Sequence, residues 1–253
     1  MNPSKMDFAK KLLALQQTLF PRSCSLCREA LHPRQQTLCT GCLDSLPFNT
    51  PSCLRCAEPL VSSGICPACQ KKPPKFRRCY TLCQYRYPIS SAINRIKKNP
   101  FAPEAKQLSW LFADRLLSNY QLDDVPKLLI PMPIHPLKLL YRGFNQSLII
   151  AQFLSSKMAG TEVIDNICRR KKIGKSQRLG SRRQRLKIPP DTFNINHHSP
   201  LQGMSIALID DVITTGATAN AASASLLNAG AKSVDLWCIA KTSWHNGSGS
   251  IRI

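Results

Sequence analysis

The sequence contains no long apolar run and few acidic side chains. In its 253 residues, no stretch approaches the roughly 20 consecutive apolar residues that a membrane-spanning helix needs. The apolar segment 12–20 is interrupted by polar residues and is not followed by a small-residue cleavage site, which argues against a secretory signal. These absences predict a cytoplasmic protein with no membrane span.

The shortage of acidic residues makes the chain strongly basic. It has 14 Asp and Glu against 35 Lys and Arg, which gives a formal net charge of +21. A general solubility charge is one explanation, but the excess is clustered: Arg169–Lys187 holds ten basic residues and no acid. Clustering favours a polyanionic partner, above all nucleic acid. The predicted nucleic-acid-binding residues are Arg169, Arg170, Lys171, Lys172, Lys175, Arg178, Arg182, Arg183 and Arg185.

Other absences exclude particular kinds of site. The Gly-Lys-Ser/Thr signature of nucleoside triphosphatases is missing, and the five histidines show no metal-ligand spacing. Few aromatic residues lie beside basic ones, so sequence-specific readout of nucleic acid is not predicted.

Cysteine is abundant by contrast, with twelve residues. In a chain without a secretory signal, metal binding is favoured over disulfides. Two Cys-x-x-Cys pairs can enclose one tetrahedral zinc ion, and four thiolates leave no open position for chemistry. We therefore predict two structural zinc ions. The successive pairing gives one site from Cys24, Cys27, Cys39 and Cys42 and another from Cys53, Cys56, Cys66 and Cys69, with an interleaved pairing as the alternative.

Beyond the cysteines, segments of strand and helix periodicity alternate, which predicts an α/β domain with a parallel sheet. The pattern predicts four regions: an N-terminal helix within 1–22, a double zinc-binding module at 23–72, an α/β domain at 79–244 and a tail at 245–253. Within the α/β domain, a helix is expected to open in Leu140–Ser147, and a strand is expected at Val163–Cys168.

The stretch Ile206–Thr218 carries the strongest signal for a ligand site. An apolar run typical of a buried strand is followed by Asp210 and Asp211, a turn rich in threonine, and an alanine-rich helix. Open α/β sheets bind ligands at the carboxyl ends of their strands. The helix start, the hydroxyl groups and a glycine suit a phosphate, whereas the carboxylates suit sugar hydroxyls or a hydrated Mg²⁺. A phosphorylated sugar satisfies both requirements.

Arg142, next to Gly143, is a second candidate anion ligand. Because a guanidinium group can hold two phosphate oxygens at once, an arginine near a predicted helix start favours phosphate binding.

The string at 206–218 closely resembles the 5-phosphoribosyl-1-pyrophosphate (PRPP) loop of type I phosphoribosyltransferases. Together with the four cysteine pairs, the basic Pro-Pro linker at 71–78 and Arg-Gly-Phe-Asn-Gln at 142–146, it is similar to the ComF/GntX family over about residues 20 to 242. The resemblance implies a type I phosphoribosyltransferase sheet with helices on both faces, and a loop at Arg169–Lys187 that closes over PRPP.

The resemblance also implies residue roles. Asp210 and Asp211 would hold the ribose hydroxyls, Mg²⁺ would accompany the pyrophosphate, and Arg142 with Gly143 would face the pyrophosphate. The 5-phosphate would be held by Thr214, Thr215, Gly216, Ala217 and Thr218. Asp210, Asp211 and Arg142 are thus the candidate catalytic residues.

Two functions are compatible with these features. The first is a ComF-like protein that binds PRPP and handles incoming single-stranded DNA in natural transformation, with a helicase or DNA-uptake protein as a possible partner. The alternative is an active phosphoribosyltransferase of nucleotide metabolism or salvage that acts on an unidentified acceptor. A third interpretation makes the zinc module an adaptor for a protein partner.

Overall fold

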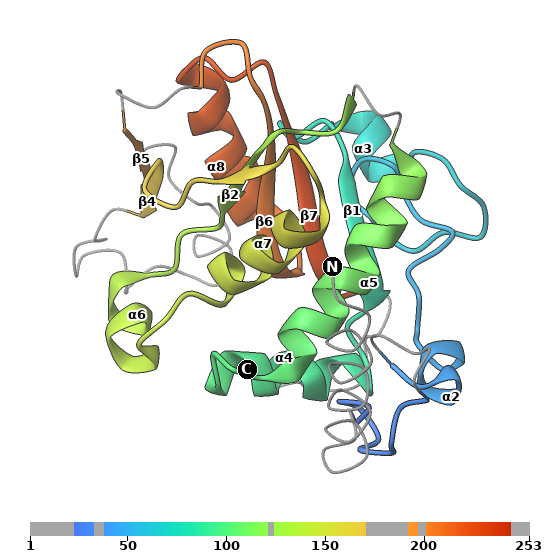
Figure 1. Ribbon diagram of the computed structural model, residues 1–253. Helices are drawn as coiled ribbons and strands as arrows, with labels where there is room; N and C mark the ends of the chain where they lie inside the picture. Colours follow the sequence, from blue (N-terminus) through green and yellow to red (C-terminus); the bar gives the residue numbers. More distant parts are fainter. Residues whose placement is uncertain (1–22, 33–37, 121–123, 171–191, 197–200, 244–253) are drawn as a thin grey trace, which may run out of the picture. The chain divides into compact units, whose positions relative to one another are not determined.

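The computed structural model describes residues 23–32, 38–120, 124–170, 192–196 and 201–243 (Figure 1). Its contacts divide the chain into two compact units, Met1–Leu46 and Pro47–Ile253. The first unit contains the short helix α2 (Thr40–Asp44) and the first two cysteine pairs. The predicted N-terminal helix, the part of the basic segment from Lys171 to Arg185, and the tail lie outside the described residues.

The second unit is built on a five-stranded sheet whose pairings are all parallel, in the order β1-β7-β6-β2-β3. This confirms the predicted α/β class. β6 lies in the middle of the sheet, and its Leu208 is aligned with Ile130 on one side and Leu236 on the other. The strands are β1 (Cys79–Gln84), β2 (Leu128–Pro131), β3 (Glu162–Val163), β6 (Ser205–Ile213) and β7 (Ser233–Lys241).

Helices cover the sheet on both faces (Figure 1). α7 packs on β2 and β6, and α5 packs on β1, β7 and α7, whereas α8 contacts β6 and β7. Among the described residues, none of the helices combines the length and the apolar character needed to cross a membrane. The helices of this unit are α3 (Pro67–Lys71), α4 (Ile89–Lys98), α5 (Pro103–Asn119), α6 (Pro136–Arg142), α7 (Gln146–Lys157) and α8 (Ala217–Asn228).

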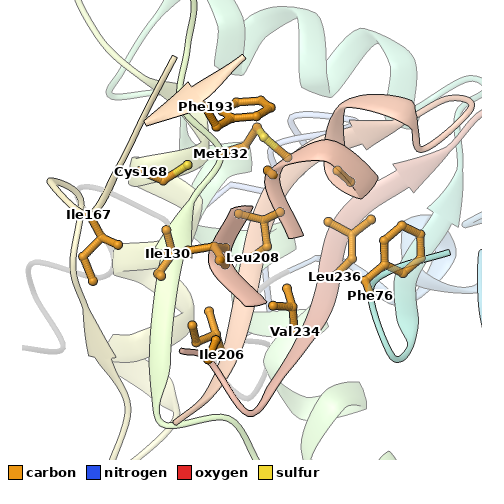
Figure 2. Close-up of a cluster of buried hydrophobic side chains, with 14 of the residues drawn as sticks. Phe76, Ile130, Met132, Ile167, Cys168, Phe193, Ile206, Leu208, Val234 and Leu236 are labelled. Carbon is orange, nitrogen blue, oxygen red and sulfur yellow. The ribbon is translucent and has the colours of Figure 1, made fainter. Parts of the chain in front are cut away.

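Side-chain alternation along the strands builds the core on the α8 face (Figure 2). Ile206 and Leu208 of β6 and Val234 and Leu236 of β7 are buried there, each two positions apart, as the pleat of a strand requires. The antiparallel pair β4 (Cys168–Arg170) and β5 (Phe193–Ile195) adds further apolar side chains to the same cluster. The intervening residues of the strands are also buried, which explains why the sequence shows continuous apolar runs.

Two predicted elements differ from the structure. The strand expected at Val163–Cys168 is split, because β3 ends at Val163 and β4 begins at Cys168 in a different sheet. The exposed pair Asp165-Asn166 lies between them, and such residues favour turns.

The helix expected to open within Leu140–Ser147 does open there, at Gln146, but the expectation that Arg142 lies at its start is wrong. α6 ends at Arg142, and Gly143 closes it in the left-handed region with φ +81°. α7 then begins at Gln146, after Asn145 caps it by accepting a hydrogen bond from the Ser147 N–H at 3.0 Å. Arg142 therefore belongs to the last turn of a helix.

Chain connections diverge between β2 and β6. From β2 the chain passes through α7 to β3 at one edge of the sheet, whereas from β6 it passes through α8 to β7 in the opposite direction. Such a divergence leaves a crevice at the carboxyl ends of the two strands, where open α/β sheets bind ligands.

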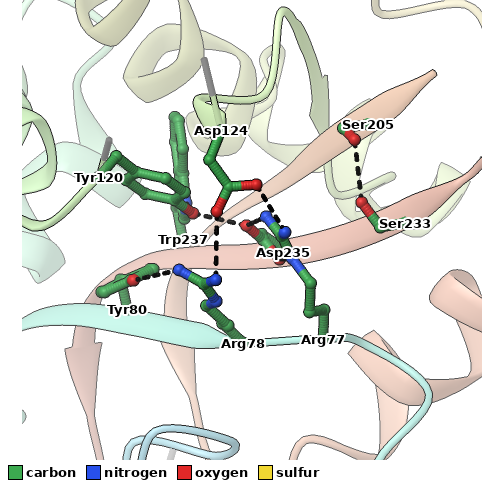
Figure 3. A network of polar contacts seen from close by, with 9 residues as sticks. All are labelled: Arg77, Arg78, Tyr80, Tyr120, Asp124, Ser205, Ser233, Asp235 and Trp237. Atoms are coloured by element: carbon green, nitrogen blue, oxygen red, sulfur yellow. Dashed lines mark hydrogen bonds and ion pairs between the residues drawn. The ribbon is translucent and has the colours of Figure 1, made fainter. Parts of the chain in front are cut away.

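A buried polar network secures the opposite end of β7 (Figure 3). Asp235, fully buried, accepts two hydrogen bonds from Arg77, at 2.8 and 2.7 Å, and one from the Tyr120 hydroxyl at 2.6 Å. Trp237 in turn donates to the Tyr120 hydroxyl at 2.9 Å. Burial and the neighbouring carboxylate raise the pKa of Tyr120, so it remains a donor. The network ties the segment before β1 and the end of α5 to the sheet.

We expect Asp235→Asn to destabilise the protein strongly. The substitution preserves the side-chain shape but removes the buried negative charge that compensates Arg77, and breaking such a pair costs about 3–5 kcal/mol. The free energy of unfolding from urea denaturation measures the loss. Asp124→Asn is the control, because Asp124 also pairs with Arg77 at 2.8 Å but its side chain is 38% exposed. Its loss should be about 0–1 kcal/mol, and equal losses would contradict the assignment.

Candidate functional site

A cavity of about 210 Å³ lies at the carboxyl ends of β2 and β6. Its walls come from the segment after β2, the last residues of β6, the start of α8, and the ends of α4, α6 and α7. It contains both aspartates of the predicted site, and Arg142 lines it as well. The tertiary structure thus brings together residues that are far apart in the sequence, and we call this space the Asp210 cavity.

The two aspartates of the cavity are held by different partners. Ser147 donates a hydrogen bond to Asp210 at 3.0 Å, and Gln146 donates one to Asp211 at 3.1 Å. The Lys97 ammonium lies 2.9 Å from the other oxygen of Asp211. Both donors and the lysine belong to helices on one face of the sheet, so the carboxylates are oriented before any ligand arrives.

Their environments drive the two carboxyl pKa values apart. Burial, followed by the charge of Asp211, raises the pKa of Asp210 well above its ordinary value. Burial by itself would also raise the pKa of Asp211, but the Lys97 ammonium and the hydrogen bonds with Asp210 and Gln146 together outweigh it, and the pKa is lowered. Asp211 is therefore the more readily ionised of the two.

Four cationic side chains surround this acidic pair: Lys97, Lys138, Arg142 and Arg170. Arg142 donates a hydrogen bond to Gln146, which links it to Asp211. The Nε of Arg170 is buried and has no hydrogen-bond partner among the described residues. A buried guanidinium donor without a partner is unusual and indicates a place for an anion.

Of the predicted nucleic-acid-binding residues, the structure describes two, Arg169 and Arg170, and only one of them lines the Asp210 cavity. Arg170 of β4 lines the Asp210 cavity, whereas its neighbour Arg169 is exposed and does not. The remaining members of that set, from Lys171 to Arg185, lie outside the described residues.

The predicted phosphate loop turns from β6 into α8. β6 ends at Ile213, and Gly216, with φ +74°, caps α8. Thr215 Oγ1 accepts a hydrogen bond from the Ala217 N–H at 3.2 Å. Thr214, Gly216, Ala217 and Thr218 line the Asp210 cavity, but neither Thr215 nor Gly143 does. The N-terminus of α8 therefore faces the same space as the carboxylates, with the partial positive charge of its first turn.

A fully buried lysine supports this loop from behind. Lys241, only 1% exposed, donates a hydrogen bond to the Thr214 carbonyl at 2.8 Å. Its ammonium also lies 2.9 Å from a carboxylate oxygen of Glu58, two residues after the Cys-x-x-Cys pair at 53–56. The ring of Phe76 lies so close to Gly216 that a β-carbon there would be 3.6 Å from it. The second cysteine module therefore supports the phosphate loop through Lys241, and the segment after the module packs against the loop at Gly216.

The cysteine modules share a local geometry. In the first, the Arg28 N–H donates to the Cys24 carbonyl at 2.8 Å, and Arg28 is left-handed with φ 71°. In the second, the Ala57 N–H donates to the Cys53 carbonyl at 2.8 Å, and Ala57 has φ 57°. The same tight turn thus follows the start of both modules, which are an internal structural repeat.

Each module brings four thiols together, in the successive pairing, so the interleaved alternative is wrong. The sulfur atoms of each group lie within 4.8 Å of one another. Cys27 and Cys39 are 3.5 Å apart, and Cys56 and Cys66 are 3.7 Å apart. Tetrahedral zinc with Zn–S bonds of about 2.3 Å requires S–S distances of about 3.8 Å. Both groups fit zinc, and neither has room for a further ligand.

Backbone groups prepare one thiol of each module, Cys24 and Cys53, for metal binding. Burial alone would raise the pKa of Cys24, yet backbone N–H groups, including those of Cys27 and Cys39, lower it to about 7. The pKa of Cys53 is lowered to about 7 in the same way, against the effect of burial. Because zinc binds the thiolate, this shift favours the metal-bound state.

Three residues of the site were not predicted from the sequence: Lys97, Ser147 and Lys241. Of these, Lys241 carried a detectable signal, because it follows a continuous apolar strand without any turn residue in between. Lys97 lies on the periodic helix α4, and nothing in its spacing relates it to Asp211.

We expect Lys241→Met to lower the free energy of unfolding by about 3–5 kcal/mol, because Glu58 would remain buried without its cation. Combining Lys241→Met with Glu58→Gln removes that unpaired charge. The double variant should therefore be more stable than the sum of the two single losses predicts, as urea denaturation of all four proteins would measure. Simple additivity of the losses would contradict the buried ion pair.

The chain is similar to known proteins over most of its length. The double zinc ribbon domain family matches residues 15–70. The DNA utilization protein YhgH of Escherichia coli O157:H7 is 29% identical over 225 residues, covering 88% of this chain and 98% of that protein. Competence protein F of Haemophilus influenzae is 30% identical over 225 residues, covering 86% and 96%.

Solved structures similar to this chain include a hypoxanthine phosphoribosyltransferase of Staphylococcus aureus, with 12% identity, a TM-score of 0.37 and coverage of 54% of this chain and 62% of that one. A purine phosphoribosyltransferase of Pyrococcus horikoshii has 16% identity, a TM-score of 0.33 and coverage of 54% and 71%. The extent and level of the sequence match to competence protein F decide the assignment: the chain belongs to the ComF/GntX family, the family of competence protein F.

Proposed function

We propose that this chain is a cytoplasmic ComF-like protein that binds PRPP in the Asp210 cavity and handles single-stranded DNA during natural transformation. The observation that carries the first half is the combination, in one cavity, of two carboxylates, four cations and a helix N-terminus.

The charges of the cavity match the parts of PRPP. The loop Thr214–Thr218, at the start of α8, would hold the 5-phosphate through backbone N–H groups and hydroxyls. Asp210 and Asp211 would accept hydrogen bonds from the ribose hydroxyls, and Asp211 could face a hydrated Mg²⁺. Arg142 and Arg170 would hold the pyrophosphate, whose two phosphoryl groups suit guanidinium forks.

Arg170 gives the strongest single reason to expect a polyanion here. Its buried Nε lacks a partner among the described residues, and burial lowers the pKa of Arg170. An anionic ligand would satisfy the donor and reverse that shift. In the sequence, Arg170 immediately precedes the strongly basic segment 171–187.

The DNA half rests on charge and on the names of the relatives. Relatives over most of the chain are called DNA utilization protein and competence protein F. The net charge of +21 supplies a physical basis for binding a polyanion without sequence specificity. A helicase or another DNA-uptake protein would be the natural partner of such an activity.

Two variants test the PRPP site. Asp210→Asn with Asp211→Asn should weaken Mg²⁺-dependent PRPP binding at least about 100-fold, because it removes charged acceptors worth about 1.5–3 kcal/mol each. Arg170→Met should weaken it about tenfold or more through loss of a charge-assisted hydrogen bond. Isothermal titration calorimetry on the full chain measures both affinities.

The matched control for the aspartate pair is Asp114→Asn with Glu162→Gln. This variant removes the same charge from two exposed positions, and neither residue lines the Asp210 cavity. It should bind PRPP as the wild type does. If the two double variants bound PRPP with the same affinity, the cavity would not be the PRPP site.

Binding of single-stranded DNA should depend steeply on salt. For about five phosphate contacts, log K should fall with log salt concentration with a slope of about −3.5. Fluorescence anisotropy of a labelled oligothymidylate, titrated at several salt concentrations, measures this slope. An affinity that stayed constant between low and moderate salt would refute the electrostatic account.

A further inference from the structure

A second and larger cavity, of about 650 Å³, lies elsewhere in the unit Pro47–Ile253. Its floor is the outer edge of β1, and one wall is the C-terminal half of α5. The other wall is the second cysteine module, between Phe48 and Ile65. No residue lines both this cavity and the Asp210 cavity. We call it the β1 groove, and nothing in the PRPP proposal makes use of it.

The β1 groove is strongly cationic. Arg55, Arg77, Arg78 and Arg115 line it, and no aspartate or glutamate is among its described lining residues. The charges of two of these arginines are compensated by carboxylates that do not line the groove. Arg77 pairs with the buried Asp235, and Arg78 pairs with Asp124 at 3.1 Å (Figure 3). The other two have no carboxylate within ion-pair distance in the part of the chain that the structure describes. The groove therefore presents an uncompensated positive charge at its two walls.

Flat apolar surface accompanies this charge. The guanidinium carbon of Arg115 lies 3.7 Å from the centre of the Phe48 ring, so the two groups are stacked. Tyr80, on the floor, lies beside Arg78 and accepts a hydrogen bond from it at 3.4 Å (Figure 3). Leu54 at 57% and Ile65 at 41% exposure add apolar area to the groove lining.

These features fit a ligand that is both anionic and aromatic. A free phosphate would need neither the rings nor a space of this size. Proteins that bind single-stranded nucleic acid combine cationic groups for the phosphates with aromatic or guanidinium planes for the bases. The β1 groove offers the two kinds of group side by side.

An added peptide strand fits the groove less well. β1 is the edge strand of the sheet, and an open edge is a common docking place for extended peptides. Here, however, the edge is already used by the chain itself: the Asn49 N–H donates to the Leu82 carbonyl at 3.1 Å, and the Gln84 N–H donates to the Pro47 carbonyl at 2.8 Å. The groove therefore has to recognise its ligand through side chains.

We propose that the β1 groove binds nucleotide units of a single-stranded nucleic acid, with Arg55 and Arg115 contacting phosphates and Phe48 and Tyr80 contacting bases. This rests on the proposed DNA-handling function and adds a place for the strand that is separate from the Asp210 cavity.

The test compares two charge-matched double variants of the full chain. Arg55→Gln with Arg115→Gln should weaken binding of a labelled oligothymidylate about tenfold or more at moderate salt. It should also reduce the magnitude of the salt slope by about 1.4, the value for two lost phosphate contacts. Lys106→Gln with Lys127→Gln removes two exposed cations that line neither cavity, and it should leave the affinity within about twofold of wild type.

Folding and site integrity are checked by PRPP binding, which both double variants should retain. Equal weakening by the two double variants would overturn the groove proposal and favour diffuse charge instead. Unchanged binding by both double variants would also overturn the groove proposal. If wild-type protein failed to bind the oligonucleotide at any salt concentration, the DNA-handling function itself would fail.

Thymidine monophosphate separates a strand from a free nucleotide. It presents the same phosphate and base as one unit of the labelled strand. We expect it to compete only at concentrations far above those of the oligothymidylate, because a strand occupies several contacts at once. Competition at equal concentration would overturn the proposal and assign the groove to a small nucleotide.

Discussion

The buried ion pair between Lys241 and Glu58 connects the parts on which the cavity depends. Lys241 ends the last strand of the sheet, Glu58 belongs to the second cysteine module, and the lysine also holds the Thr214 carbonyl. A buried charge is tolerated only when its partners are fixed, so the pair constrains the module and the loop to one arrangement. The second zinc site thus contributes to the shape of the Asp210 cavity without lining it, because its turn at 53–58 carries the carboxylate.

The topology gives the two cavities of the unit Pro47–Ile253 different charges. The divergence of the chain between β2 and β6 creates a small space lined by two aspartates and four cationic side chains, and this space suits a compact ligand with both phosphates and hydroxyls. The outer edge of β1 is instead bordered by a larger groove with arginines and rings but no acid among its described lining residues. The two sites therefore differ in charge balance as well as in size, and they favour different classes of anion. With PRPP proposed for one site and a DNA strand for the other, a single chain would have separate places for both ligands.

Local patterns predicted much of the fold. β6 and α8 follow the order expected from the stretch Ile206–Thr218, because each carries a strong local signal. The predictions that were wrong concern chain breaks. Arg142, which was expected near the start of the helix opening in Leu140–Ser147, instead ends α6, since Gly143 separates α6 from α7 and a glycine can either interrupt or start a helix. The split of Val163–Cys168 shows that a strand pattern does not reveal which sheet the strand joins.

The sequence by itself determined the classes of chemistry: thiol pairs at zinc spacing, an acidic pair before a phosphate-type turn, and a large cationic excess. These signals are local, because each depends on residues that are neighbours in the chain. Only the tertiary structure decided which groups meet. It separated the zinc ligands into successive sets, brought Lys97 to Asp211, and placed Arg170 inside the Asp210 cavity. Those contacts join residues from different helices and strands, and their energies depend on burial, which the order of residues alone does not specify.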